Sequence, residues 1–194
     1  YQKANELLLS VPEQDRSSTV TYWLGEISYR LREFDQSRDY FTQVSKDSGD
    51  PTLTRQSYFG VIKALYGQEQ WNEALQRIQS LSQDLLTPKL LLIAGDCALN
   101  LKEYTNAMRF YQNIRDAYPK NSLAQDALYF SGYTAYKLEQ FEQARDYFAD
   151  LIRNYPANEY VGAAQFLKGW TYFREERYAD AIREMARELR VPLI

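Results

Sequence analysis

The stretch Ala127-Leu128-Tyr129-Phe130-Ser131-Gly132 returns 37 residues later as Ala164-Gln165-Phe166-Leu167-Lys168-Gly169. Each copy is followed by an aromatic residue and, three places further on, by an alanine: Phe141 and Ala144, then Tyr178 and Ala181. Self-similarity at a period of about 20 to 50 residues is typical of stacked repeats. The pattern predicts that each copy is a pair of antiparallel helices, in which small residues let the two helices approach closely.

The same pattern extends over all 194 residues. The small residue of each second helix lies at positions 4, 37, 74, 107, 144 and 181, with spacings of 33, 37, 33, 37 and 37 residues. We therefore predict an all-α fold, a right-handed superhelix of about eleven helices in a single array. It consists of a trailing helix at 1–12 and five helix-turn-helix repeats at 18–50, 52–87, 88–120, 122–157 and 159–192. Pro12 and Pro192 are expected to end the first and last segments.

The repeat at 52–87 is the least regular of the five. Ile62 stands where the other repeats have a glycine, so we expect the two helices of this repeat to splay or shift. An alternative register places Gly60 at that position, but it leaves two extra residues before Ala74. The first register is therefore preferred.

Composition argues against several classes of site. The sequence has no histidine, which removes the usual general base and the commonest metal ligand, and no cofactor is expected. The net charge of −3 argues against a positively charged surface that would bind nucleic acid. No apolar run is long enough to insert into a membrane. The one cysteine, Cys97, is expected to be buried rather than reactive. Because the chain begins partway into a repeat, upstream targeting would not be visible.

An enzyme based on carboxylates is the contrasting hypothesis. It would need two carboxyl groups facing each other across a cleft at about 5 to 9 Å. Glu26 and Asp96 are separated by an intervening repeat, and phosphate-binding glycine loops and nucleophile elbows are missing. The sequence favours a non-enzymatic protein, and a deep cavity lined by carboxylates would reopen the question.

Helix-turn-helix units with a period near 34 and a proline near the end resemble the tetratricopeptide repeat family over the whole chain. Tyr22-Trp23-Leu24-Gly25-Glu26, Tyr118-Pro119-Lys120-Asn121-Ser122 and Tyr155-Pro156-Ala157-Asn158 resemble its bacterial cell-envelope subgroup. That subgroup includes the periplasmic coordinator of the Tol-Pal system and the outer-membrane lipoprotein that assists β-barrel assembly. The resemblance implies a periplasmic or outer-membrane-associated scaffold, although the residues do not rule out the cytoplasm. The chain departs from both proteins in having at least five repeats and no lipidation site or coiled coil.

First helices line the concave side of such an array, so their inner faces carry the candidate binding residues. The middle positions of these faces are Glu26, Lys63, Asp96, Tyr133 and Trp170. The flanking positions of the last two repeats are Tyr129, Tyr136, Phe166 and Phe173, and aromatic residues at this spacing are usually buried between helices. Large aromatic residues at middle positions are typical of anchors for a partner.

We expect the groove to bind an extended or helical segment of another protein, with Tyr133 and Trp170 as its anchors. Four cations, Arg30, Lys63, Lys137 and Arg174, would pair with carboxylates of this partner, unless each belongs to a solvated helix face. Charged residues such as Glu142 and Arg145 are interpreted as solvated. An alternative function is self-assembly into homo-oligomers, because the terminal repeats expose apolar faces that a neighbouring repeat would cover.

Two further groups of aromatic residues receive a structural interpretation. The first stands at the turn within each repeat and is expected to seal it: Phe34, Trp71, Tyr104, Phe141 and Tyr178. Trp23 lies beside a glycine and is expected to pack on the preceding repeat.

Overall fold

The computed structural model describes residues 1–189, and the regular structure in this part of the chain is helical. The α-helices are Gln2–Leu9 (α1), Ser18–Arg30 (α2), Phe34–Asp47 (α3), Pro51–Gly67 (α4), Trp71–Gln79 (α5), Pro88–Asn100 (α6), Tyr104–Ala117 (α7), Leu123–Lys137 (α8), Phe141–Asn154 (α9), Val161–Arg174 (α10) and Tyr178–Leu189 (α11). Two 3-10 helices, Glu13–Asp15 (η1) and Gln83–Leu85 (η2), lie between them. Over the described residues, the predicted all-α fold with eleven helices is confirmed. The predicted stop at Pro192 lies outside them.

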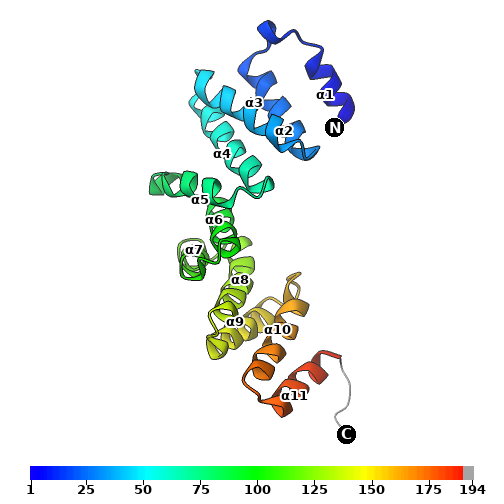
Figure 1. Ribbon diagram of the computed structural model, residues 1–194, viewed down its shortest axis with the longest axis vertical. Coiled ribbons are helices and arrows are strands. Elements are labelled where there is room, and N and C mark those ends of the chain that lie inside the picture. The colour runs from blue at the N-terminus through cyan, green and yellow to red at the C-terminus, as the bar shows by residue number, and fades with distance from the viewer. Residues whose placement is uncertain (190–194) are drawn as a thin grey trace. The chain divides into compact units, whose positions relative to one another are not determined.

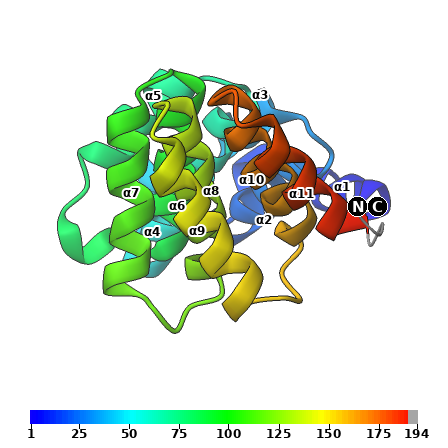
Figure 2. The ribbon, with the colours of Figure 1, turned by 90° about the horizontal axis from the view of Figure 1, so that it is seen from below.

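The chain divides into two compact units, Tyr1–Ser80 with α1 to α5 and Leu81–Ile194 with α6 to α11 (Figure 1). In each unit, consecutive helices pack against one another. Figures 1 and 2 both show α10 and α11 side by side at the C-terminal end of the second unit. The arrangement of all five repeats in a single array with the expected boundaries stays a prediction.

The same tight turn joins the two helices of every pair. A non-glycine residue takes a left-handed backbone conformation in each turn, with φ between 59 and 65°: Arg32, Glu69, Lys102, Glu139 and Glu176. In the turn from α6 to α7, the N–H of Lys102 donates to the carbonyl of Leu99 at 3.0 Å, and the N–H of Glu103 donates to that of Ala98 at 2.8 Å. These are the two hydrogen bonds of a Schellman motif, and they recur in all five turns. Each second helix therefore begins at the same offset.

Pairs of aromatic residues are in contact across four of these turns. The ring centroids of Tyr29 and Phe34 lie 5.5 Å apart, and those of Tyr66 and Trp71 lie 5.1 Å apart. The corresponding pairs in the second unit are Tyr136 with Phe141 at 6.0 Å and Phe173 with Tyr178 at 5.4 Å. The structural role predicted for the turn aromatics is confirmed for Phe34, Trp71 and Phe141, whereas Tyr178 contacts Phe173 but is 53% exposed.

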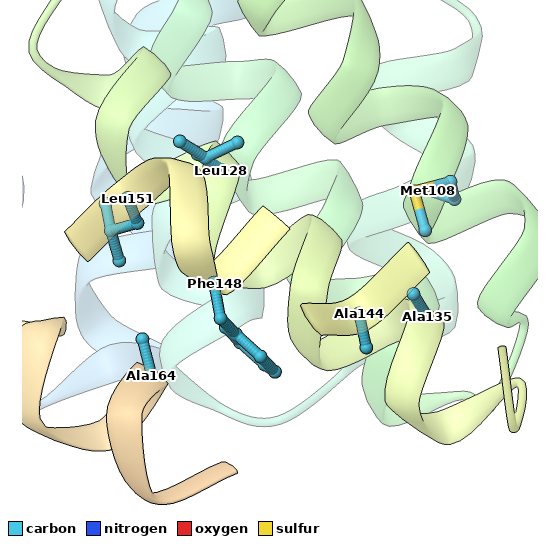
Figure 3. Packing of buried hydrophobic residues seen from close by; sticks show 7 residues of the cluster. All are labelled: Met108, Leu128, Ala135, Ala144, Phe148, Leu151 and Ala164. Carbon is cyan, nitrogen blue, oxygen red and sulfur yellow. The ribbon is translucent and has the colours of Figure 1, made fainter. Parts of the chain in front are cut away.

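Close approach of the paired helices depends on glycines that face an aromatic ring. A Cβ atom on Gly95 would lie 2.4 Å from Cε1 of Tyr111, and one on Gly132 would lie 2.6 Å from Cε1 of Phe148. Figure 3 shows the core around Phe148, to which α7, α8, α9 and α10 contribute Met108, Leu128, Ala135, Ala144, Leu151 and Ala164. Burial of a large ring against a glycine explains the small residue in the repeated pattern.

The second repeat departs from this arrangement as the sequence predicts. Ile62 and Ile78 are both fully buried, whereas Gly60 faces the ring of Phe41 on α3 rather than α5. Ile62 is therefore the residue that occupies the glycine position. Helix α5 has only 9 residues, and its packing on α4 is the sparsest of the five pairs.

Trp23 is placed differently from the prediction. Its side chain is 51% exposed and touches Tyr22 edge-on, with 5.7 Å between the ring centroids. Helix α1, which precedes it, has no buried residue and gives Trp23 little surface to pack on. The prediction that Trp23 packs on the preceding repeat is wrong. Along residues 1–189, we find no helix with the length and apolar character needed to span a bilayer.

Candidate partner-binding surface

Six aromatic side chains come from α8 and α10, neighbouring first helices of the second unit. We call Tyr129, Tyr133, Tyr136, Phe166, Trp170 and Phe173 the aromatic face. On α10 the rings form a continuous stack, because residues spaced by four and three lie on one side of a helix. The centroid of Trp170 lies 6.0 Å from that of Phe166 and 4.8 Å from that of Phe173, with interplanar angles of 17 and 20°.

Exposure along this stack differs from the expectation. Phe166 is 50% exposed and Phe173 is 44% exposed, while Trp170 between them is partly buried. The interpretation of Phe166 and Phe173 as buried core is therefore wrong for the described chain. Trp170 remains partly accessible to solvent, which the binding hypothesis requires.

The flanking residues of α8 are covered, as predicted. Tyr129 stacks on Tyr160 with 4.5 Å between centroids and an interplanar angle of 9°. Burial raises the pKa of Tyr129 above its ordinary value, and the nearby Tyr133 and Tyr160 add to this shift. The guanidinium of Arg174 lies 5.9 Å from the ring centroid of Tyr136. Tyr129 and Tyr136 thus pack between repeats.

Tyr133, the middle residue of α8, is half-buried and has a cation beside it. The Nζ atom of Lys137 lies 5.1 Å from the ring centroid of Tyr133. Lys137 is exposed, and no carboxylate among the side chains that the structure describes forms an ion pair with it. This arrangement leaves a lysine charge beside an aromatic ring, where both are accessible to a ligand.

In the first unit, the predicted cations pair within the chain. Nζ of Lys63 lies 2.8 Å from Oε1 of Glu26, and the two side chains are only 18 and 13% exposed. Arg30 lies 3.8 Å from the same carboxylate and donates a hydrogen bond to the hydroxyl of Tyr1 at 2.9 Å. Burial, together with the charge of Glu26, raises the pKa of Tyr29. Glu26, Lys63 and Arg30 therefore link α2 to α4 and to Tyr1 at the start of the chain, and a partner would have to displace these contacts.

Asp96 and Arg174 are likewise engaged inside the second unit. The hydroxyl of Tyr111 donates to Oδ1 of Asp96 at 2.7 Å. Nη2 of Arg174 lies 2.7 Å from Oε1 of Glu139, and the hydrogen bond with Tyr136 is the largest cause that raises the pKa of Arg174. Of the four predicted cations, Lys137 keeps the charge most available for a partner.

Sequence reasoning missed the ion pairs between repeats. Arg145 was interpreted as solvated, but its side chain is 12% exposed, and Nη1 lies 2.6 Å from Oε2 of Glu175. Its guanidinium lies 4.5 Å from the ring centroid of Tyr172. A second ion pair, between Lys168 and Glu184 at 2.7 Å, joins the paired helices α10 and α11. A spacing of 30 residues between Arg145 and Glu175 gives no signal that a single sequence could reveal.

The described residues form neither a deep cavity nor a cluster of metal ligands of the kind that catalysis would use. An open surface hollow of about 520 Å³ is lined by Gln140, Phe141, Glu142, Gln143, Asp146 and Glu175. It is open to solvent, in contrast to the deep cavity that would favour a hydrolase. Among the described residues, no group of three possible ligands could hold a metal ion. Cys97 is buried, as predicted, and its burial raises the thiol pKa to about 12.

Comparison with protein families places the chain. Residues 86–190 match the family described as the outer membrane lipoprotein YfiO, and this segment is more than half of the 194 residues. The chain belongs to the YfiO family. It is a protein of the tetratricopeptide repeat type, as the sequence predicts. No curated protein matches the chain.

Solved structures share the fold at low sequence identity. MamA from Desulfovibrio magneticus RS-1 superposes with a TM-score of 0.75 at 14% identity, covering 90% of this chain and 94% of MamA. YrrB, described as a tetratricopeptide repeat protein with an unusual peptide-binding site, gives 0.69 at 14% identity and covers 95 and 92%. The apo form of RapI gives 0.76 at 13% identity, covering 96% of this chain and 58% of RapI. These similarities establish the fold alone.

Proposed function

We propose that this member of the YfiO family is a non-enzymatic scaffold that binds a segment of a partner protein through Tyr133 and Trp170. The observation that carries the proposal is the ring stack on α10, in which Trp170 lies between two exposed phenylalanines. Aromatic side chains of this kind lose little conformational entropy on binding and dominate the energetics of many interfaces.

The chemistry of the surface defines the segment that it would bind. An apolar or aromatic side chain of the partner would pack beside Trp170 and Tyr133. A carboxylate of the partner would pair with Lys137, which has no acidic partner among the described residues and lies 5.1 Å from the ring centroid of Tyr133. We therefore infer a segment that combines a bulky apolar residue with an acidic one. The ion pair would add specificity more than affinity.

The family supports a place in the bacterial cell envelope. YfiO is described as an outer membrane lipoprotein, so we propose that the partner belongs to a complex of the periplasm or of the outer membrane. YrrB shows that a related fold can hold a peptide-binding site.

The proposal is tested by measuring affinity for a partner identified by crosslinking and mass spectrometry in native cells. Trp170→Ala and Tyr133→Ala should each weaken binding by at least about tenfold, which corresponds to about 1.4 kcal/mol. Trp23→Ala is the matched control, because it removes an equally large side chain that is 51% exposed on the first unit. Circular dichroism would confirm that each variant is folded. Unchanged affinity in both Trp170→Ala and Tyr133→Ala would contradict the proposal.

A further inference from the structure

Helix α8 carries only two charged residues, and they flank the tyrosines that it contributes to the aromatic face. Asp126 is in its first turn and Lys137 is in its last turn. The two are 11 residues, or about three turns, apart, so they share one side of α8 with Tyr133. At a rise of about 1.5 Å per residue, the charged residues are separated by about 16 Å along the helix.

Neither charge of α8 is neutralised by an ion pair with another described side chain. Lys137 is exposed and lies beside the ring of Tyr133. Asp126 is partly buried, and its Oδ1 accepts a hydrogen bond from Nδ2 of Asn158 at 3.1 Å. The amide of Asn158 is a neutral donor, so it satisfies the carboxylate oxygen without cancelling its charge.

The charges of α10 are compensated within the chain. This helix also carries two charged residues, Lys168 and Arg174. Lys168 pairs with Glu184 at 2.7 Å, and Arg174 pairs with Glu139 at 2.7 Å. The two first helices that carry the aromatic face therefore leave it with a negative charge at one end of α8 and a positive charge at the other.

The negative end extends to the residue that precedes Tyr160. This residue, Glu159, is exposed, and the ring of Tyr160 stacks on Tyr129 with 4.5 Å between centroids. Burial raises the pKa of Tyr160, and the negative charges of Glu159 and Asp126 raise it further. Both carboxylates therefore act on the stacked rings at this end of the aromatic face.

We propose that the partner segment carries a basic and an acidic residue on opposite sides of its apolar anchor, and that the two charges of α8 set its direction. This inference rests on the function proposed above. The acidic residue lies at Lys137, and the basic residue lies at Asp126 and Glu159. An extended segment advances about 3.3 Å per residue, so charges about 16 Å apart are about five residues apart. The opposite direction would bring like charges together and is disfavoured.

Three synthetic hexapeptides with blocked ends test this charge pattern. Each has a central tryptophan, and the residues at its two ends are one arginine and one glutamate, two glutamates, or two arginines. NMR titration of the isotope-labelled protein gives their affinities. At low salt, the mixed peptide should bind about three- to fivefold more tightly than either of the others. The difference should shrink at high salt, because exposed ion pairs are screened.

Charge variants of α8 should change which peptide binds best. Lys137→Glu should favour the peptide with two arginines, and Asp126→Lys should favour the peptide with two glutamates. Asp126→Asn keeps an acceptor for Asn158, and it should reduce the preference for the mixed peptide over the one with two glutamates. The matched control is the double variant Glu142→Lys and Arg153→Glu. It reverses a first-turn acid and a last-turn base, also 11 residues apart, on α9, outside the aromatic face, and should leave the preference unchanged.

The inference is overturned if the three peptides bind equally, or if Lys137→Glu leaves their order unchanged. It is also overturned if none of them binds at concentrations up to about 1 mM, or if Trp170→Ala leaves their binding unchanged. The proposed function is decided separately, by the loss of the native partner in Trp170→Ala and Tyr133→Ala. Equal binding of the three peptides that Trp170→Ala weakens would therefore support the anchor and reject the charge pattern.

Discussion

Single side chains at the contact between paired helices decide how closely those helices approach. Gly95 lies against Tyr111, which is fully buried and whose hydroxyl is held by Asp96. The ring therefore cannot move away without breaking other contacts. Sequence alone predicts the glycine, because it recurs at a fixed offset from an aromatic residue. It does not predict the hydrogen bond of Tyr111 with Asp96, since no repeat pattern links those two positions.

Gly95→Ala should consequently destabilise the protein by about 1–3 kcal/mol, the usual cost of overpacking a rigid core. Gly162→Ala is the matched control, because nothing lies within 4 Å of the added methyl group on α10. It should stabilise by up to about 1 kcal/mol through helix propensity. Urea unfolding monitored by circular dichroism measures both, and equal destabilisation by the two variants would contradict the packing argument.

The buried thiol predicts a dependence of stability on pH. The pKa of Cys97 is raised to about 12 by burial, with a further contribution from Asp96, while an unfolded chain has a value near 9. The folded state thus holds its proton more tightly, so its stability should be full below about pH 9 and should fall between pH 9 and 12. In Cys97→Ala this alkaline loss should be smaller. An identical pH profile for both proteins, measured by urea unfolding, would show that Cys97 does not contribute.

At the scale of the helical element, the turn between paired helices fixes where the second helix begins. The five Schellman motifs place a non-glycine residue in the left-handed region, which costs L-amino acids roughly 1 kcal/mol or more. The sequence predicts where each turn lies from its aromatic residue but not its conformation, because glycine, the usual signal, is missing there. The hydrogen bonds of the motif and the sealing aromatic pairs hold the backbone in place.

Lys102→Gly should therefore raise the free energy of unfolding by about 0.5–1 kcal/mol, because glycine adopts this conformation without strain. Thr105→Gly, in the first turn of α7 and equally exposed, should lower it by a similar amount. Thermal and urea unfolding of both variants give the comparison. Destabilisation by Lys102→Gly would mean that the turn is not strained.

Neighbouring helices also explain where the site prediction failed. Phe166 and Tyr129 occupy the same position of successive repeats, yet only Tyr129 is covered, by Tyr160. Burial at this position is a property of the next helix and not of the residue itself. The sequence also placed Arg30 and Lys63 correctly on the first helices of two successive repeats. It could not show that both cations would pair with the carboxylate of Glu26.

For the whole molecule, the repeat pattern was the strongest signal in the sequence. A period of 33 or 37 residues predicted the eleven helices and the tetratricopeptide type, which the structure and the YfiO family bear out. The partner and its position on the aromatic face are proposals. The repeat pattern determines the helices and their packing, but the residues at the middle positions differ from one repeat to the next. Those positions change from the charged Glu26, Lys63 and Asp96 to the aromatic Tyr133 and Trp170 along the chain.

Site-specific photocrosslinking in native cells tests the central claim most directly. A photoreactive phenylalanine analogue is placed at Tyr133 or Trp170, and at the exposed control positions Gln79 and Arg109. Our account predicts that the same partner protein is captured from positions 133 and 170 and not from 79 or 109. Capture from the control positions alone, with none from 133 or 170, would contradict it.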